Sequence, residues 1–346
     1  MKHQTTRYGE IPFYKIGTFD NTADAFISKK LFLEYKTKYS FPKKGDILIS
    51  ASGTIGRAVI YDGKPAYFQD SNIVWIDNDE TLVKNDFLFY AYSNVKWNTE
   101  HTTILRLYND NFRNTLIPLP PLNEQNAIAN ILSALDRYLC TLDALILKKE
   151  GVKKSLSFEL LSQRKRLKGF NQAWQRVRLG DVANYLTSNL SVEQITQQGK
   201  IKVYDVNNFI GYTDTTFISD KPYISIIKDG SVGRVRILPP KTNILSTMGA
   251  LIANHKTTTE FLFYLLSNFD FKNFTSGSII PHIYFKDYKE KTIFLPPLNE
   301  QSTIANILSA LDNEIASLKN KKRQFENIKK ALNHDLMSAK IRVLKK

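Results

Sequence analysis

The sequence predicts an α+β protein made of two tandem repeats, each a strand-rich domain followed by a long helix, with the two helices pairing as an antiparallel coiled coil. Two observations carry this prediction. The stretch PPLNEQNAIANILSALD at 120–136 returns as PPLNEQSTIANILSALD at 296–312, with differences at two of 17 positions. After each copy, apolar residues recur at about 3.5-residue spacing for several heptads, which is typical of coiled-coil helices. The predicted segments are 1–118, 119–168, 169–295 and 296–346.

The duplication extends upstream of these two stretches. DFLFYAYSN (86–94) matches EFLFYLLSN (260–268), and the loop SGTIGR (52–57) matches DGSVGR (229–234). The separation of matching positions drifts in the first part of each repeat and stays at 176 from the approach to PPLNEQ onward. A period this long indicates two domain-plus-helix units rather than a solenoid of short repeats. Each repeat therefore joins a divergent domain to a nearly constant helix.

The divergent domains are predicted to consist of short strands and short helices. FPKKGDILISAS (41–52) and RAVIYDG (57–63) are predicted strands on either side of a glycine-containing turn. The two FLFY segments are predicted to be short apolar helices whose aromatic side chains lie in the core. RKRLKGFNQAW (164–174) is a predicted polar linker, with Gly169 placed after the end of the first long helix.

The start of each long helix is marked by the same residue types. The Pro-Pro pair ends the preceding strand, and Asn123 and Asn299 are predicted to cap the helices. Glu124 and Glu300 follow in the first turn, where the helix dipole favours negative charge.

A seam of apolar residues is predicted to hold the two helices together. Cys140 is predicted to be a small core residue of this seam. Gly151 is predicted to be a weak point where the first helix bends, because glycine costs ~1 kcal/mol against alanine. The seam residues are Ile128, Leu132, Leu135, Leu139, Leu142, Ile146, Val152, Leu156 and Leu160, and Ile304, Leu308, Leu311, Ile315, Leu318, Phe325, Ile328, Leu332 and Leu336.

The net charge of +15 indicates a polyanion or an acidic partner. Fourteen of these net charges lie in 148–168 and 319–346, whereas the domains are nearly neutral. The first half of each helix is mildly acidic and the second half is strongly basic, so antiparallel pairing sets unlike charges side by side. The alternative is that these are solvated faces of two unrelated helices. The same two interpretations, solvated face or contact with DNA phosphates or a partner, apply to Lys148, Lys149, Lys153, Lys154, Lys329 and Lys330.

The composition of the chain and the absence of certain motifs exclude several classes of protein. The length of 346 residues and the 42% hydrophobic content fit two globular domains, and a single cysteine rules out a disulfide framework. The polar N-terminus and the absence of a long apolar run predict a soluble, cytoplasmic protein. The chain has no G-x-x-x-x-G-K-[ST] phosphate loop, no N-P-P-[YF]-like methyltransferase tetrapeptide and no His/Cys cluster with metal spacing. We therefore expect no catalytic residues, no cofactor and no bound metal.

Five motifs give the chain a family resemblance. They are LPPLNEQ with IANILSALD after each domain, the SGTIGR and DGSVGR loops, SIIPHIYFKDY (278–288), WQRVRLGDV (174–182) and KIRV (340–343). With these motifs the chain resembles the specificity (S, or HsdS) subunits of type I restriction-modification systems over nearly its whole length.

The resemblance implies a DNA-reading protein with no catalysis of its own. Two target recognition domains would each read one half of a split site in double-stranded DNA. The paired helices would set the spacer and bind two methyltransferase subunits, which carry S-adenosylmethionine and methylate adenine. A further motor subunit would hydrolyse ATP and cut DNA. The alternative function is a coiled-coil adaptor whose domains bind protein.

The first domain departs from the family pattern at its start. Ten residues precede Ile11, whereas 27 separate Trp174 from the matching Ile201. The first domain thus has no counterpart of WQRVRLGDVANYLTSNL (174–190). Either its opening strand comes from elsewhere, with the C-terminal end of the chain lying near it in a circular arrangement, or the first domain is truncated.

The candidate DNA-reading residues lie in two pairs of matching segments. The SGTIGR and DGSVGR loops place hydroxyls, glycines and an arginine together, a combination that suits a phosphate or a guanine edge. A plain hairpin turn is the alternative. In TTILRLY (102–108) and SIIPHIY (278–284), Arg106 aligns with His282, as expected of two readers with different targets; a loop histidine without such a role is the alternative. Tyr14 and Asn208 are weaker candidates, and Asn207-Asn208 also fits a turn. The full set is Ser52, Thr54, Arg57, Thr102, Thr103, Arg106, Asn207, Lys221, Ser231, Arg234, Arg236, Ser278 and His282.

Overall fold

The computed structural model describes residues 4–68, 72–97 and 106–344. The chain divides into two compact units. The first unit comprises Met1–Asp143 and Asn320–Lys346, and the second comprises Ala144–Lys319. Each unit contains strands, short helices and a stretch of both long helices, which confirms the predicted α+β fold with its two repeats.

The first unit holds two three-stranded sheets. One has the order β2-β1-β5, with β1 antiparallel to β2 and parallel to β5. The other has the order β4-β3-β6, with β3 antiparallel to both neighbours. The elements are β1 (Ile11–Tyr14), β2 (Ala25–Ile27), α1 (Lys29–Lys38), β3 (Ile47–Ser50), β4 (Ala58–Ile60), β5 (Tyr67–Phe68), β6 (Ile73–Ile76), α2 (Asn85–Tyr92) and α3 (Asn109–Arg113).

The second unit repeats these sheets and adds strands to them. Its sheets have the orders β10-β9-β13 and β12-β11-β14-β8, and two short pairs, β17-β7 and β15-β16, complete the set. The elements are β7 (Gln175–Arg178), β8 (Ala183–Thr187), β9 (Ile201–Tyr204), β10 (Phe209–Thr213), β11 (Tyr223–Ile227), β12 (Val235–Leu238), β13 (Thr242–Ile244), β14 (Met248–Ala253), α5 (Thr259–Ser267), β15 (Thr275–Ser276), β16 (His282–Ile283), α6 (Phe285–Tyr288) and β17 (Thr292–Leu295).

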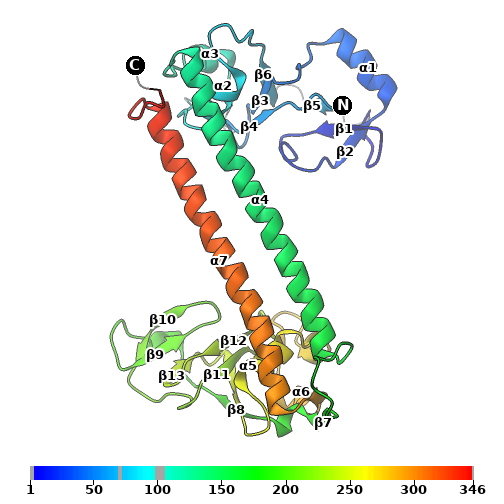
Figure 1. The fold of residues 1–346 in the computed structure, drawn as a ribbon, viewed down its shortest axis with the longest axis vertical. Coiled ribbons are helices and arrows are strands. Elements are labelled where there is room, and N and C mark those ends of the chain that lie inside the picture. The colour runs from blue at the N-terminus through cyan, green and yellow to red at the C-terminus, as the bar shows by residue number, and fades with distance from the viewer. Residues whose placement is uncertain (1–3, 69–71, 98–105, 345–346) are drawn as a thin grey trace. The chain divides into compact units, whose positions relative to one another are not determined.

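The two FLFY segments form the short apolar helices α2 and α5, as predicted. Each helix joins its domain to the long helices within its own unit (Figure 1). Phe87 and Tyr90 of α2 share a core cluster with Leu132. Phe261 of α5 shares the matching cluster with Leu308. These aromatic side chains are buried, and Phe89 and Phe263 pack partly buried against the same clusters, so their interpretation as core residues is confirmed.

The long helices α4 (Leu122–Leu161) and α7 (Leu298–Met337) run antiparallel in both units. In the first unit Asp143 pairs with Lys322 at 2.7 Å, and Asp136 pairs with Lys329. In the second unit Lys149 pairs with Glu314 at 2.8 Å, Glu150 with Lys319 at 2.6 Å and Lys153 with Asp312. Residue numbers rise along α4 as they fall along α7, so each basic half of a helix lies beside an acidic half, as the charge pattern predicted.

The seam follows the predicted residues with three differences. Val152 is 45% exposed and Ile328 is 51% exposed, so their placement in the seam was wrong. Cys140 is also exposed, because it lies on the outer side of α4. The helix α4 continues through Gly151 without a break. None of the described helices is long and apolar enough to cross a membrane.

Two glutamines explain part of the duplicated PPLNEQ motif. Gln125 is fully buried; it accepts a hydrogen bond from the N–H of Lys84 at 2.8 Å and donates to the carbonyl of Leu82 at 3.0 Å. Gln301 accepts from the N–H of Thr258 at 3.0 Å and donates to the carbonyl of Lys256 at 3.0 Å. In each unit, therefore, one glutamine ties the start of a long helix to the loop before α2 or α5.

The aspartates that end the duplicated stretch also make matching contacts. Asp136 accepts a hydrogen bond from the hydroxyl of Tyr90 at 2.7 Å, and Asp312 accepts one from Tyr264 at 2.9 Å. Each aspartate also pairs with a lysine of the opposite helix. The sequence repeats here because the same contacts are made twice.

Candidate nucleic-acid interface

The SGTIGR and DGSVGR loops are the hairpin turns β3–β4 and β11–β12. The second glycine of each pair has a positive φ and faces an aromatic ring. A Cβ on Gly56 would lie 2.4 Å from Trp97, and a Cβ on Gly233 would lie 2.7 Å from Phe271. The hairpin-turn interpretation therefore accounts for the glycines without a ligand.

Each loop lies directly beside the second candidate segment of its unit. Ser52 forms an isolated antiparallel bridge with Arg106, and Asp229 forms the matching bridge with His282. The N–H of the residue after Arg106, Leu107, donates to the carbonyl of Ala51 at 2.9 Å. The structure thus brings together, in both units, the two segments that sequence reasoning selected separately.

The matching bridges carry different side chains on the same backbone arrangement. In the second unit His282 Nδ1 lies 2.6 Å from Asp229 Oδ1, and its ring stacks on Tyr284 at 6.4 Å between centroids. In the first unit the same positions hold Ser52 and Arg106. The second unit therefore presents a histidine–carboxylate pair where the first presents an exposed guanidinium.

Two arginines of the second unit converge on one asparagine. Arg234 donates from Nη2 to the side-chain oxygen of Asn207 at 2.8 Å, and Arg236 donates from Nη1 to the backbone carbonyl of Asn207 at 2.8 Å. The guanidinium of Arg236 also lies 5.4 Å from the ring centre of Tyr204. These contacts hold both arginines in fixed orientations, as a reader of base edges or phosphates requires.

Asn207 itself lies in a tight turn. Asp205 accepts hydrogen bonds from the N–H groups of Asn207 and Asn208 at 2.7 and 2.6 Å, so the turn interpretation of this dipeptide is confirmed. The side chain of Asn207 is nevertheless exposed and remains part of the arginine cluster.

Of the described candidates in the first unit, one is buried and three are exposed. The hydroxyl of Ser52 is buried and donates to Asn72 at 2.7 Å. Arg57 is exposed overall, but its Nη1 donates to the carbonyl of Phe19 at 3.0 Å. Ser52 is therefore placed inside the fold, which leaves Thr54, Arg57 and Arg106 as the exposed candidates of this loop pair.

The remaining candidates are scattered. Lys221, Ser231 and Ser278 are exposed on loops, and Tyr14 is half-buried against Phe68. Thr102 and Thr103 lie outside the described residues.

Two residues that contact the candidate residues of the second unit were not selected from the sequence. Tyr204 lies beneath Arg236, and Asp229 faces His282. Asp229 occupies the position that matches Ser52 in the aligned loops, so the difference between the loops was a signal for it. No feature of the sequence pointed to Tyr204, because its contact with Arg236 joins two strands that belong to different sheets.

The helix lysines divide into two groups. Lys149, Lys153 and Lys329 pair with carboxylates of the opposite helix. Lys148, Lys154 and Lys330 are exposed. Among the residues that the structure describes, no group of three or more His, Cys, Asp or Glu side chains is arranged to hold a metal ion.

Comparison with known proteins decides the family. The profile of the family described as the type I restriction modification DNA specificity domain matches residues 1–149 and 171–327. The chain belongs to this family. The two matched regions coincide with the two repeats, so this type I specificity chain carries two copies of the domain.

Individual relatives agree with this assignment. A putative type I restriction enzyme specificity subunit of Haemophilus influenzae is 62% identical over 137 residues, which is 39% of this chain and 36% of that protein. The putative MjaX specificity subunit of Methanocaldococcus jannaschii is 29% identical over 86% of this chain and 79% of its own length. The crystal structure of a type I S subunit from M. genitalium shares the fold, with a TM-score of 0.65 at 20% identity over 97% of this chain and 91% of that one.

Proposed function

We propose that this type I specificity chain reads a bipartite DNA site without catalysing a reaction itself. Residues 1–118 and 169–295 each read one half-site, and the helices bind two methyltransferase subunits. The observation that carries the proposal is the pair of matching bridges, Ser52–Arg106 and Asp229–His282. Two identical backbone arrangements that carry different polar side chains suit two readers with different targets.

The reading residues of the second domain are His282, Arg234 and Arg236. The two guanidinium groups supply donors for guanine edges or phosphates, and the histidine beside Asp229 supplies a donor in fixed orientation. In the first domain, Arg106 has the corresponding role.

Mapping of modified adenines tests this function. The chain is co-expressed with an adenine methyltransferase subunit, and the methylated positions are mapped across the host genome. We expect a single split motif. Arg106→Ala should change the bases read in one half, and Arg234→Ala or His282→Ala should change only the other half. Arg113→Ala, an exposed arginine that pairs with Asp110, is the matched control and should leave the motif unchanged.

An unchanged methylome despite a stable complex would contradict the proposal. It would favour the alternative, an adaptor whose domains bind protein. Salt dependence gives a second criterion, since contacts to phosphates make log K fall linearly with log salt concentration.

The helices are proposed to set the spacer between the half-sites. Residues 142–148 of α4 lie opposite 317–323 of α7, as the pair Asp143–Lys322 shows. Removing both stretches deletes one heptad from each helix, about 10 Å of helix length. This corresponds to about three base pairs at 3.4 Å each. The spacer in the methylated motif should shorten while both half-sites stay the same, and unchanged spacing would refute the role.

A further inference from the structure

Phe209 is an apolar residue next to the arginine cluster of the second unit. It is the first residue of β10 and follows two residues after Asn207, which holds both Arg234 and Arg236. Its side chain is 43% exposed. Single exposed apolar residues are common on protein surfaces, so the contacts of Phe209 decide whether it has a role.

A β-bulge in β10 brings Phe209 and Tyr212 to the same face of their sheet. Phe209 pairs with Tyr204 of β9, but Gly211 pairs with Val203, so the register shifts between them. Residues three apart in a regular strand point to opposite faces. Because of the bulge, the rings of Phe209 and Tyr212 meet edge-on at 5.1 Å between their centres. Bulges are known to re-aim side chains in this way.

Tyr204 connects Phe209 to the two arginines. The ring of Phe209 meets the ring of Tyr204 edge-on, at 6.0 Å between centres. The guanidinium of Arg236 lies 5.4 Å from the centre of the same tyrosine ring. Arg236 also donates to the carbonyl of Asn207, and Arg234 donates to its side chain, both at 2.8 Å. One apolar ring and two guanidinium groups are therefore joined by direct contacts.

The matching phenylalanine of the first unit is buried. The pattern I-x-x-Y-x-x-x-x-F occurs at 11–19 and at 201–209, so Phe19 corresponds to Phe209. Phe19 is only 1% exposed, and its carbonyl accepts a hydrogen bond from Arg57 at 3.0 Å. The strand β2 pairs with β1 in a regular register, without a bulge. The exposure of Phe209 is therefore a property of the second unit and is not imposed by the shared fold.

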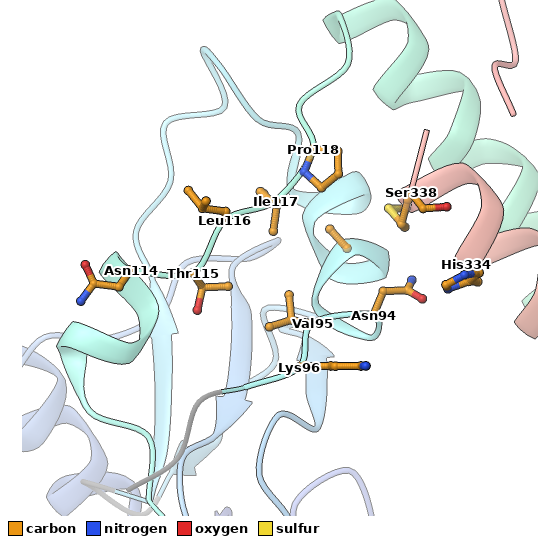
Figure 2. A pocket seen from close by; sticks show the side chains of 12 residues that line it. Asn94, Val95, Lys96, Asn114, Thr115, Leu116, Ile117, Pro118, His334 and Ser338 are labelled. Atoms are coloured by element: carbon orange, nitrogen blue, oxygen red, sulfur yellow. The ribbon is translucent and has the colours of Figure 1, made fainter. Parts of the chain in front are cut away.

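Exposure of an apolar side chain does not by itself indicate contact with DNA. Leu116 of the first unit is 94% exposed, far more than Phe209. It lines a cavity of about 380 Å³, and Figure 2 shows it beside Thr115, with His334 of α7 on the other side. No arginine is among the described residues that line this cavity. Phe209 differs from Leu116 because guanidinium groups accompany it.

The chemistry of this surface fits the major-groove edge of a base pair that contains thymine. Guanidinium groups donate to guanine edges or phosphates, and thymine presents an apolar C5 methyl group that phenylalanine can contact. Two rings lie against Phe209, and less than half of its side chain is exposed. It therefore offers an apolar contact patch, whereas a wedge must project far enough to enter between base pairs.

We propose that Phe209 reads a thymine of the second half-site by contact with its C5 methyl group, beside the groups that Arg234 and Arg236 contact. This role rests on the proposed function and adds an apolar contact to its polar ones. At the matching position the first unit offers no such contact, since Phe19 lies inside the fold.

Replacement of thymine by uracil removes only the methyl group in question. The methylated motif is placed in a fluorescein-labelled duplex, which is titrated with the full chain in complex with the methyltransferase subunit. Each thymine of the second half-site, on either strand, is replaced in turn by deoxyuridine. One replacement should weaken binding about fourfold, the effect of exposing one buried methyl group. With Phe209→Ala, the same replacement should have no effect.

Phe294→Ala is the matched control. Phe294 belongs to the same unit, is 50% exposed and lies on β17, opposite Arg176 of β7. This variant should keep the fourfold difference between thymine and uracil. Phe209→Leu keeps an apolar side chain and should keep part of the difference, and thermal melts check that all three variants are folded.

The methylome of Phe209→Ala gives an independent measurement. The thymine position of the second half-site should accept other bases, while the remaining positions of both half-sites stay the same. The methylome of Phe294→Ala should equal that of the unmodified chain.

Three results would contradict this role and leave the proposed function intact. They are a second half-site without thymine, a uracil effect that persists in Phe209→Ala, and no uracil effect in the unmodified chain. Bending of the duplex that is lost in Phe209→Ala, measured by energy transfer between its ends, would assign the ring to a wedge and overturn the proposal too. A complex that prefers no motif at all would overturn the proposed function itself and this role with it.

Discussion

Arg342 donates hydrogen bonds from Nε and Nη2 to the two carboxylate oxygens of Glu124, and this pair repeats the pair of Arg166 with Glu300 at a distance of 176 residues. The segment after α7 therefore lies beside the start of α4 in the first unit, as the segment after α4 lies beside the start of α7 in the second. The C-terminal segment thus lies beside the start of α4, but none of its described residues forms an opening strand for the first domain.

Removing Arg166 should destabilise the second unit. Glu300 is 1% exposed, and Arg166→Met leaves its charge buried with only the indole of Trp174 as a donor. We expect a loss of about 2–3 kcal/mol, somewhat below the usual range for a broken buried pair because Arg166 is partly exposed. Urea unfolding with hydrogen exchange of residues 144–319 measures the loss. The double variant Arg166→Met/Glu300→Gln should recover most of it; no recovery would argue against a charge effect.

We expect the contribution of the Arg342–Glu124 pair to stability to depend on pH. The hydrogen bond from Arg342 lowers the pKa of Glu124 below its usual range. A lowered pKa in the folded state contributes stability above the unfolded value near about 4.3 and loses it as pH falls. The stability gap between the unmodified chain and Arg342→Met should therefore be present at neutral pH and close in acid. Urea unfolding across this pH range measures it, and a gap that widens in acid would contradict the assignment.

We expect the protein to lose stability in alkali because two tyrosines have raised pKa values in the folded state. Burial, followed by the hydrogen bond to Asp312, raises the pKa of Tyr264, and burial with Asp136 raises that of Tyr90. Burial also raises the pKa of Tyr92 and Tyr223 to about 12. A raised pKa in the folded state gives stability that is present below the unfolded value of about 10 and lost as pH rises above it.

Thermal melts followed by circular dichroism between pH 8 and 11.5 should therefore show a midpoint that falls above about pH 10. The double variant Tyr90→Phe/Tyr264→Phe should fall less steeply. Tyr39→Phe, at a half-exposed position, is the control and should follow the unmodified chain. Identical slopes in all three proteins would rule out these tyrosines as the cause.

The glycine pair of each loop allows a matched comparison. Gly230 and Gly233 both have positive φ, but a Cβ on Gly230 meets open space whereas one on Gly233 meets Phe271. Gly230→Ala should cost about 1–2 kcal/mol from backbone strain alone. Gly233→Ala should cost about 1–3 kcal/mol more from overpacking. Gly53→Ala and Gly56→Ala give the same comparison in the first unit, where Trp97 is the neighbour. Equal losses within a pair would contradict the packing explanation.

Much of the fold follows from local patterns in the sequence. The heptads predict two long helices, and the FLFY segments predict the short core helices. The acidic first half and basic second half of each long helix predict the antiparallel direction. Val152 and Ile328 were misplaced because each helix carries apolar residues outside the buried stripe, and spacing alone does not separate the two. Gly151 did not break α4, since packing along the rest of a 40-residue helix outweighs a cost of ~1 kcal/mol.

The sequence by itself determined that this protein is a duplicated specificity chain, because a repeat and its motifs are properties of the order of residues. It also selected the loops of Arg106 and His282 as candidates. Only the tertiary structure decided that those loops touch, that Ser52 is buried, and that Asp229 and Tyr204 join the second cluster. These facts depend on contacts between residues far apart in the chain.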